Sequence, residues 1–137
     1  LLMFTRPYPD MKHVLDELAA RAALAVLTNK PLAGTRRILD GLNLARYFAP
    51  ERVLGGDGPL PRKPDPAGLR HLMDRAGVDR GATVMVGDSA IDRKTARAAA
   101  TRACLVRYGF GFASVPKHEI DSDVVLVSSP RELLTVL

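Results

Sequence analysis

Two carboxylates four residues apart mark the segment VMVGDSAID, which covers residues 84–92. Within it, the apolar run 84–86 predicts a buried strand, and the Ala-rich residues 90–100 predict a helix. Asp88 then follows the strand and Asp92 lies one helical turn further on, at the same edge of the sheet. Two carboxylates this close repel each other unless a cation lies between them, and Mg²⁺ prefers hard oxygen ligands. The pair therefore indicates a magnesium site.

Ser89 keeps a structural interpretation of the same segment open. An Asp or Ser between a strand and a helix is most often a helix N-cap, whose side chain accepts hydrogen bonds from backbone amides. Taken alone, the segment is compatible with that role. The rest of the chain has to decide between a cap and a metal site.

Further polar residues are predicted at the same edge of the sheet. Thr28 and Asn29 end and follow the apolar run 23–28, and Lys63 lies in the Gly/Pro-rich loop 56–64. In parallel sheets, ligands bind beyond the carboxyl ends of the strands. A hydroxyl, an amide, an ammonium and two carboxylates suit a phosphoryl group and its Mg²⁺. Each also has a structural alternative, as turn caps for the first two residues and as an ordinary loop lysine for the third.

The whole chain alternates apolar strands with amphipathic helices. Strands are predicted at residues 23–28, 52–55, 84–86, 103–107 and 124–127. Helices are predicted to begin near Asp10, Pro31, Asp65, Ala90 and Ser129. Strands that alternate with helices favour right-handed parallel crossovers. The sequence thus predicts one domain over residues 1–137, a three-layer α/β/α fold with a mainly parallel sheet.

Composition narrows the class of protein. The chain has 137 residues, 47% of them hydrophobic, and no apolar run approaches the length of a membrane span. The net charge of +5 comes from scattered arginines and aromatic residues make up 5% of the chain, so we predict a solvated basic surface and no nucleic-acid site. The single cysteine, Cys104, lies in an apolar segment and is predicted to be a buried thiol of a cytoplasmic protein.

Three motifs follow one another along the chain: VLTNK at residues 26–30, RKPDP at residues 62–66 and VGDSAID at residues 86–92. In this order, and on these kinds of element, they resemble the motifs of the haloacid dehalogenase-like phosphohydrolases, especially the phosphoglycolate phosphatase-like subgroup. The resemblance extends to YGFG at residues 108–111 and SSPRELL at residues 128–134. It implies a Rossmann-like core and a Mg²⁺-dependent phosphomonoester hydrolase that acts on a small phosphorylated metabolite.

The resemblance also implies roles for the polar residues. Thr28 would hydrogen-bond the transferring phosphoryl group, with Asn29 beside it. Lys63 would neutralise charge on the nucleophile and on the phosphate. In this assignment the three residues form the phosphate-binding part of the site.

The metal side of the site is implied in the same way. Asp88 would ligate Mg²⁺, and Asp92 would support the metal through water or orient Lys63. Ser89 would steady the loop and cap the helix. Asp65 belongs to the turn of the second motif and is expected to be structural.

Two departures from the family pattern affect these expectations. Ala100 stands where the family usually has Gly at the end of a helix, and its effect should be local. The family's nucleophile is the first Asp of an Asp-x-Asp pair after the first strand, which this sequence does not contain. The Asp-x-Asp pair here, Asp121 and Asp123, precedes the strand 124–127. It is therefore predicted to lie at the wrong end of the sheet for catalysis.

The chain begins with Leu1, and residues 5–10 resemble the segment where these proteins return to the core after a helical cap. We expect that an N-terminal piece with the first strand, the nucleophile and the cap is missing. In the family that strand lies between the strands ending at Thr28 and Asp88, so two buried edges would stay unpaired. This chain alone should then be inactive, and either poorly stable or completed by dimerisation or by the missing segment.

Other functions remain open at this point. A phosphomutase of the same family differs in the cap, whereas a dehalogenase needs no metal and is disfavoured by the pair Asp88 and Asp92. A non-catalytic binding or regulatory fragment on the same scaffold is a further alternative. A response-regulator receiver domain also uses carboxylates, a Thr and a Lys, but in a different order along the chain.

Overall fold

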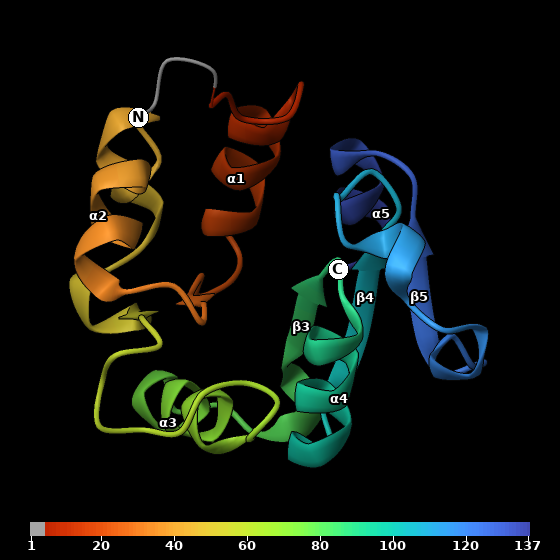
Figure 1. Cartoon of the computed structure of the whole chain (residues 1–137). Coiled ribbons are helices and arrows are strands. Elements are labelled where there is room, and N and C mark those ends of the chain that lie inside the picture. Colours follow the sequence, from red (N-terminus) through yellow and green to blue (C-terminus); the bar gives the residue numbers. More distant parts are fainter. Residues whose placement is uncertain (1–4) are drawn as a thin grey trace.

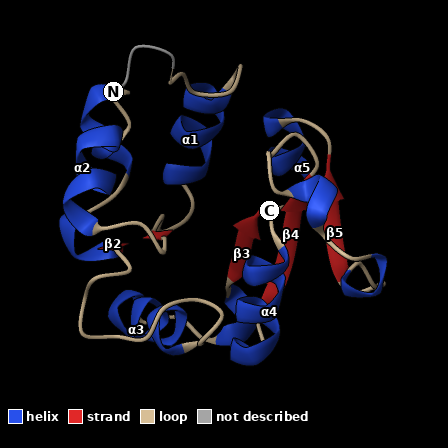
Figure 2. Cartoon of the chain, in the orientation of Figure 1, coloured by secondary structure: helices blue, strands red, loops and turns tan. Residues whose placement is uncertain are grey.

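The structure, a computed structural model, describes residues 5–137, so Leu1 lies outside the described residues. Its strands form two separate parallel sheets (Figures 1 and 2). The smaller sheet pairs β1 (Val26–Leu27) with β2 (Val53–Leu54). The larger sheet has the order β3 (Val84–Gly87), β4 (Arg102–Val106), β5 (Val124–Val127). The α/β class with parallel strands is confirmed.

Helices connect the strands, as the alternation of patterns predicted. They are α1 (Met11–Ala19), α2 (Leu32–Gly41), α3 (Ala67–Ala76), α4 (Ala90–Ala99) and α5 (Leu133–Val136). Among residues 5–137, no helix is both long and apolar enough to cross a membrane.

The larger sheet is covered by helices on both faces, which gives the predicted three layers. Consecutive residues of β4 point to opposite faces. Cys104 and Val106 face α1 and α5, in a core that also contains Val14, Leu18, Val127 and Leu133. Ala103 faces α3 and α4, in a core that also contains Leu69, Met73, Met85, Ala96 and Ala99. The Cys104 thiol is fully buried, as predicted, and burial raises its pKa to about 11.

The strand β1 is much shorter than the predicted strand 23–28, and its two residues are only half-buried. Within the described residues, β1 pairs with β2 alone and β3 pairs with β4 alone. Leu27 packs against the core cluster of Met85, so β1 and β3 belong to neighbouring parts of the fold. Val86, expected to be buried, is 40% exposed. The continuous apolar run 23–28 predicts a strand buried on both faces. This was wrong for β1, whose two residues are half-buried and which has a partner on one edge only among residues 5–137.

Two helices begin where they were predicted to begin, near Asp10 and Pro31, but their first turns differ in detail from the prediction. Asp10 occupies the N-cap position of α1, but its φ of 65° places it in the left-handed region and its side chain makes no cap bond. The Asp10 carboxylate instead accepts a hydrogen bond of 2.9 Å from Nε of Arg131. Pro31, expected in the first turn of α2, is its N-cap residue. The first amide of that helix, from Leu32, donates to Oδ1 of Asp57 at 2.8 Å.

Asp121 lies in an ion-pair network on the far side of α4, away from the carboxyl ends of the strands. Its Oδ2 accepts a 2.9 Å hydrogen bond from Nη2 of Arg93, whose side chain is only 6% exposed. Arg97 lies 3.1 Å from Oε2 of the buried Glu119. The network joins α4 to the segment before β5, so Asp121 has a structural role.

The C-cap of α4 supplies a first prediction. Ala100 has φ 57° and ψ 34°, a left-handed conformation in which a Cβ costs roughly 1 kcal/mol. The substitution Ala100→Gly should therefore raise the free energy of unfolding by about 0.5–1 kcal/mol in urea denaturation. Gly77 ends α3 at φ 67° with open space around it, so Gly77→Ala should lower stability by a similar amount. Equal effects of the same sign would contradict this explanation.

The Arg93 hydrogen bond supplies a second prediction, on pH. It holds the pKa of the Asp121 carboxyl below the usual value of 3.8. Because the folded-state pKa is the lower one, the stabilisation is complete above about pH 4 and is lost as pH falls through that lowered pKa. Asp121→Asn should thus cost stability at neutral pH and progressively less in acid, measured by urea denaturation across pH 2–6. Asp123→Asn serves as the control, since Asp123 has no ion-pair partner among the described residues. A pH-independent cost would refute the assignment.

Candidate functional site

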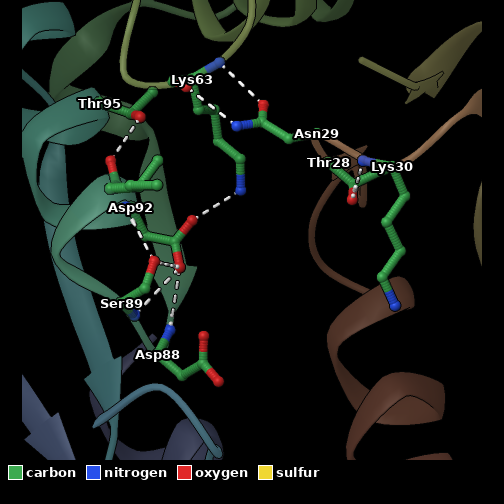
Figure 3. A network of polar contacts seen from close by, with 9 residues as sticks. Thr28, Asn29, Lys30, Lys63, Asp88, Ser89, Asp92 and Thr95 are labelled. Carbon is green, nitrogen blue, oxygen red and sulfur yellow. Dashed lines mark hydrogen bonds and ion pairs between the residues drawn. The ribbon is translucent and has the colours of Figure 1, made fainter. Parts of the chain in front are cut away.

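Asp92 is the centre of the predicted site, and its two oxygens bind different partners (Figure 3). Oδ2 accepts hydrogen bonds from the backbone amides of Asp88 (3.0 Å) and Ser89 (3.2 Å) and from the Ser89 hydroxyl (2.9 Å). Ser89 Oγ in turn accepts from the Asp92 amide, which completes a capping box at the start of α4. The side chain of Asp92 is buried, and its position at the helix N-terminus suits a negative charge. The cap predicted for Ser89 is confirmed.

Lys63 binds the other oxygen of Asp92. Its Nζ lies 2.7 Å from Oδ1, and the two side chains are 13% and 8% exposed. A buried ion pair has a short, charge-assisted hydrogen bond and little competition from water. Of the two roles expected for Asp92, orienting Lys63 is the one for which the geometry supplies a contact.

Asn29 fixes the backbone of Lys63. Its Nδ2 donates to the Lys63 carbonyl at 2.9 Å, and its Oδ1 accepts from the Lys63 amide at 2.9 Å. The side-chain amide thus spans both polar groups of one residue and ties the end of β1 to the loop before α3. Sequence reasoning had placed Asn29 beside the phosphate; the structure shows that it also positions the lysine.

Thr28 lies at the end of β1 but contacts none of these side chains. Its Oγ1 accepts a 3.1 Å hydrogen bond from the Lys30 amide. In Figure 3 Thr28 and Lys30 lie on the opposite side of Asn29 from Asp88. The structure therefore links Asn29 and Lys63 to Asp92, while Thr28 lines the same cavity as Asn29 and Lys63 without joining these contacts.

Asp88 points away from Asp92 (Figure 3). Its Oδ2 accepts a 3.0 Å hydrogen bond from the amide of Gly111, and its Oδ1 has no hydrogen-bond partner in the described part of the chain. This contact with the YGFG segment was missed at the level of sequence. The pair of glycines was the available signal, because glycine permits close approach of a backbone to a side chain.

The donor set fits part of a magnesium site. Residues 5–137 contain no group of three or more His, Cys, Asp or Glu side chains placed to hold a metal ion. Mg²⁺ needs few protein ligands, because it keeps several waters and takes one or two carboxylates together with substrate phosphate. Oδ1 of Asp88 is suited to that role, whereas both oxygens of Asp92 already have partners.

A cavity of about 230 Å³ adjoins the lysine end of the site. Leu32, Leu54 and Leu60 are among its largely apolar lining, and Asn29 and Lys63 lie at its polar end. An apolar wall provides no partners for an anion. The groups of this lining that could bind an anion therefore include Asn29 and Lys63.

A parallel α/β core with a lysine–carboxylate pair at the carboxyl ends of its strands defines the class: a Rossmann-like protein with its site at the edge of the sheet. The sequence pattern of the haloacid dehalogenase-like hydrolases matches residues 1–100. The chain belongs to that family.

Individual relatives sharpen this result. A phosphoglycolate phosphatase of Rhodospirillum rubrum is 45% identical over 104 residues, 75% of this chain and 42% of the relative. A predicted phosphoglycolate phosphatase from Haemophilus somnus has a solved structure with a TM-score of 0.84 at 27% identity, over 94% of this chain and 56% of that one. A putative β-phosphoglucomutase from Thermotoga maritima shares the fold (TM-score 0.79, 24% identity, 96% and 59% covered). The chain spans about half the length of the curated relatives that it matches.

The buried ion pair supplies the third prediction. Asp92→Asn keeps the shape of the side chain but leaves the Lys63 ammonium without its anion, so we expect a loss of roughly 3 kcal/mol in the free energy of unfolding. Lys63→Met in the Asp92→Asn background should recover part of that loss. A double-mutant cycle in urea measures the coupling.

The exposed pair of Arg46 and Asp16 is the matched control for this cycle. Its atoms are 3.7 Å apart and both side chains are more than half exposed, and the Tyr47 hydroxyl accepts from Arg46 and donates to Asp16, so its coupling should stay below about 1 kcal/mol. Equal coupling in the two cycles would show that the Lys63–Asp92 bond carries no special weight.

Proposed function

We propose that the intact protein is a Mg²⁺-dependent phosphomonoester hydrolase of the phosphoglycolate phosphatase-like kind, acting on a small phosphorylated metabolite. One observation carries this proposal: the chain of contacts from Asn29 through Lys63 to Asp92, next to the outward carboxylate of Asp88. An ammonium beside a carboxylate is the combination that suits a phosphoryl group and its metal, which supports the proposal. The phosphatase names of the relatives support it.

Lys63 and Thr28 act on the phosphoryl group. The Lys63 ammonium has three protons, of which the Asp92 bond uses one, so it can also donate to a phosphoryl oxygen. Thr28 offers a hydroxyl from the end of β1, with Asn29 beside it. Because these donors are held before substrate arrives, they stabilise developing charge without rearrangement.

Asp88 would hold Mg²⁺ through Oδ1, with Asp92 as an indirect support and Ser89 steadying the loop between them. When bound, Mg²⁺ neutralises charge on the phosphoryl oxygens and orients the phosphate. Asp92 contributes by fixing the Asp88 backbone amide and the Lys63 ammonium at the same time.

The nucleophile of the proposed reaction is an Asp on a strand between β1 and β3. It attacks phosphorus, the alcohol leaves with the bridging oxygen, and water then cleaves the aspartyl-phosphate. That strand would come from a further segment of the intact protein. The separation of the two sheets supports this proposal, and the chain of residues 1–137 should be inactive alone.

A phosphomutase and a non-catalytic scaffold protein are the alternatives. The described site residues do not distinguish a phosphomutase, which transfers the phosphoryl group to a sugar hydroxyl, from a phosphatase, which transfers it to water. Burying the charges of Lys63 and Asp92 carries a desolvation penalty. A non-catalytic scaffold could replace such a pair with apolar side chains, so the pair argues against that alternative. We also expect a cytoplasmic location, with the single thiol of Cys104 reduced and buried and no nucleic-acid partner.

Hydrolysis of p-nitrophenyl phosphate in Mg²⁺ tests the proposal and is the fourth prediction. The chain alone should be inactive. Co-expression with the part of the Rhodospirillum rubrum enzyme that it does not match should give an active complex, and EDTA should abolish the activity. In that complex Asp88→Asn and Lys63→Met should each lower kcat at least 100-fold, by loss of the metal ligand and of the phosphate donor.

Gly34→Ala is the control variant in the same complex, since the added methyl group meets no atom within 4 Å. A folded complex without activity would contradict the phosphatase assignment. Activity of the chain alone that depends on Asp88 would show that the nucleophile lies within residues 1–137.

A further inference from the structure

The segment that follows β4 folds back over Asp88. Gly109 and Gly111 lie on either side of the exposed Phe110, and the Gly111 amide donates to Oδ2 of Asp88 at 3.0 Å. Asp92, by contrast, binds the backbone amide of Asp88. Asp88 is thus held at two points, its main chain by Asp92 and its side chain by the turn.

Space excludes a side chain at Gly109 and leaves little room for one at Gly111. A Cβ added at Gly109 would lie 2.3 Å from Cβ of Asp88 and 2.6 Å from its Oδ2. A Cβ added at Gly111 would lie 3.0 Å from the Asp88 carbonyl oxygen and 3.3 Å from Oδ1. Neither glycine has a positive φ, so the absent side chain is what matters at both positions. The backbone of the turn packs directly against the carboxylate.

Contacts of the residues just before Gly109 hold the turn of residues 109–111 in place. Tyr108 is half-buried, with its ring edge-on to Tyr8 at 4.8 Å between centroids. Burial raises the pKa of the Tyr108 hydroxyl to about 12. The Gly109 amide donates to the carbonyl of Val106, at the end of β4.

Contacts of residues that follow the turn, at positions 119 and 121, hold it from the other end. Glu119 and Asp121 are bound by Arg93 and Arg97, which lie on α4 beyond Asp92. The helix that carries the Asp92 cap therefore also anchors the segment that contains the Gly111 amide. The turn, Asp88 and α4 form a closed set of contacts.

We propose that the turn of residues 109–111 is a positioning element that holds the Asp88 carboxylate in one orientation, with Oδ2 bound to Gly111 and Oδ1 presented to the metal. Hydrogen bonds that orient a metal ligand typically contribute 10- to 100-fold to metal affinity. This inference rests on the proposed function for the metal, and the hydrogen bond is tested separately from it. Gly109 and Gly111 act through Asp88 and contact neither substrate nor metal.

Amide hydrogen exchange of Gly111, followed by NMR on the full chain, tests the hydrogen bond without any metal. Asp88→Ala should speed this exchange about tenfold relative to wild type. Asp88→Asn keeps an acceptor oxygen and should leave the exchange nearly unchanged. Unchanged exchange in Asp88→Ala would overturn the proposal, whatever the metal does.

Mn²⁺ is the probe for the metal step, because it takes oxygen ligands and broadens nearby amide signals even at a weak site. Broadening of the signals around Asp88 should require about tenfold more Mn²⁺ in Gly109→Ala than in wild type. Gly34→Ala has open space around the added methyl group and should behave like wild type. Circular dichroism checks that each variant is folded.

Three outcomes distinguish the positioning role of the turn from the metal site of the proposed function. Faster Gly111 exchange in Asp88→Ala together with weaker Mn²⁺ binding in Gly109→Ala supports the positioning role. Equal Mn²⁺ binding in Gly109→Ala and Gly34→Ala overturns it. Gly111 exchange that depends on Asp88, with no Mn²⁺ broadening in wild type, would support the hydrogen bond and overturn the metal site of the proposed function.

Discussion

The buried ion pair between Lys63 and Asp92 is the interaction on which the arrangement of the site depends. The two sheets share no ladder of backbone hydrogen bonds among residues 5–137, so side chains must set how their strand ends face each other. Asn29 ties the end of β1 to Lys63, and Lys63 ties that loop to α4. A charge-assisted bond in a site with little water is strong enough, and directional enough, to do this.

Each oxygen of the buried Asp92 side chain has hydrogen-bond donors. Oδ2 accepts two backbone amides and a hydroxyl at the N-terminus of α4, where the helix dipole also favours an anion, and Oδ1 accepts from Lys63. The capping interpretation and the functional interpretation of this segment are therefore compatible. The same hydrogen bonds that begin the helix also fix the backbone of Asp88. The hydrogen bonds by which Asp92 caps α4 therefore also hold the site in place.

The division of the sheet explains the unexpected exposure of several apolar residues. The strand β1 is short and half-buried, and Val86 is 40% exposed although it lies in a strand whose neighbours are well packed. Parallel strands are normally buried on both faces and paired on both edges. An apolar strand between β1 and β3 would cover this exposed apolar surface and would pair with the open edges of both strands. The polar residues already gathered at the carboxyl ends of these strands lie where such a strand would end.

The sequence by itself determined the elements whose local signals agree with their packing. Three such elements are the strand 124–127, the helix after Ser89 and the end of α3 at Gly77. Their signals are apolar periodicity, a capping box and a left-handed glycine, each of which acts over a few residues. The sequence also indicated Lys63, Asp88 and Asp92 as candidate site residues, and the structure links them by hydrogen bonds through Asp92. Only the tertiary structure decided that β1 is short, that Asp10 pairs with Arg131, that Asn29 binds the Lys63 backbone and that Gly111 binds Asp88. These features depend on groups between 23 and 121 residues apart in the chain, or on a strand edge without a partner, and neither leaves a periodic local pattern.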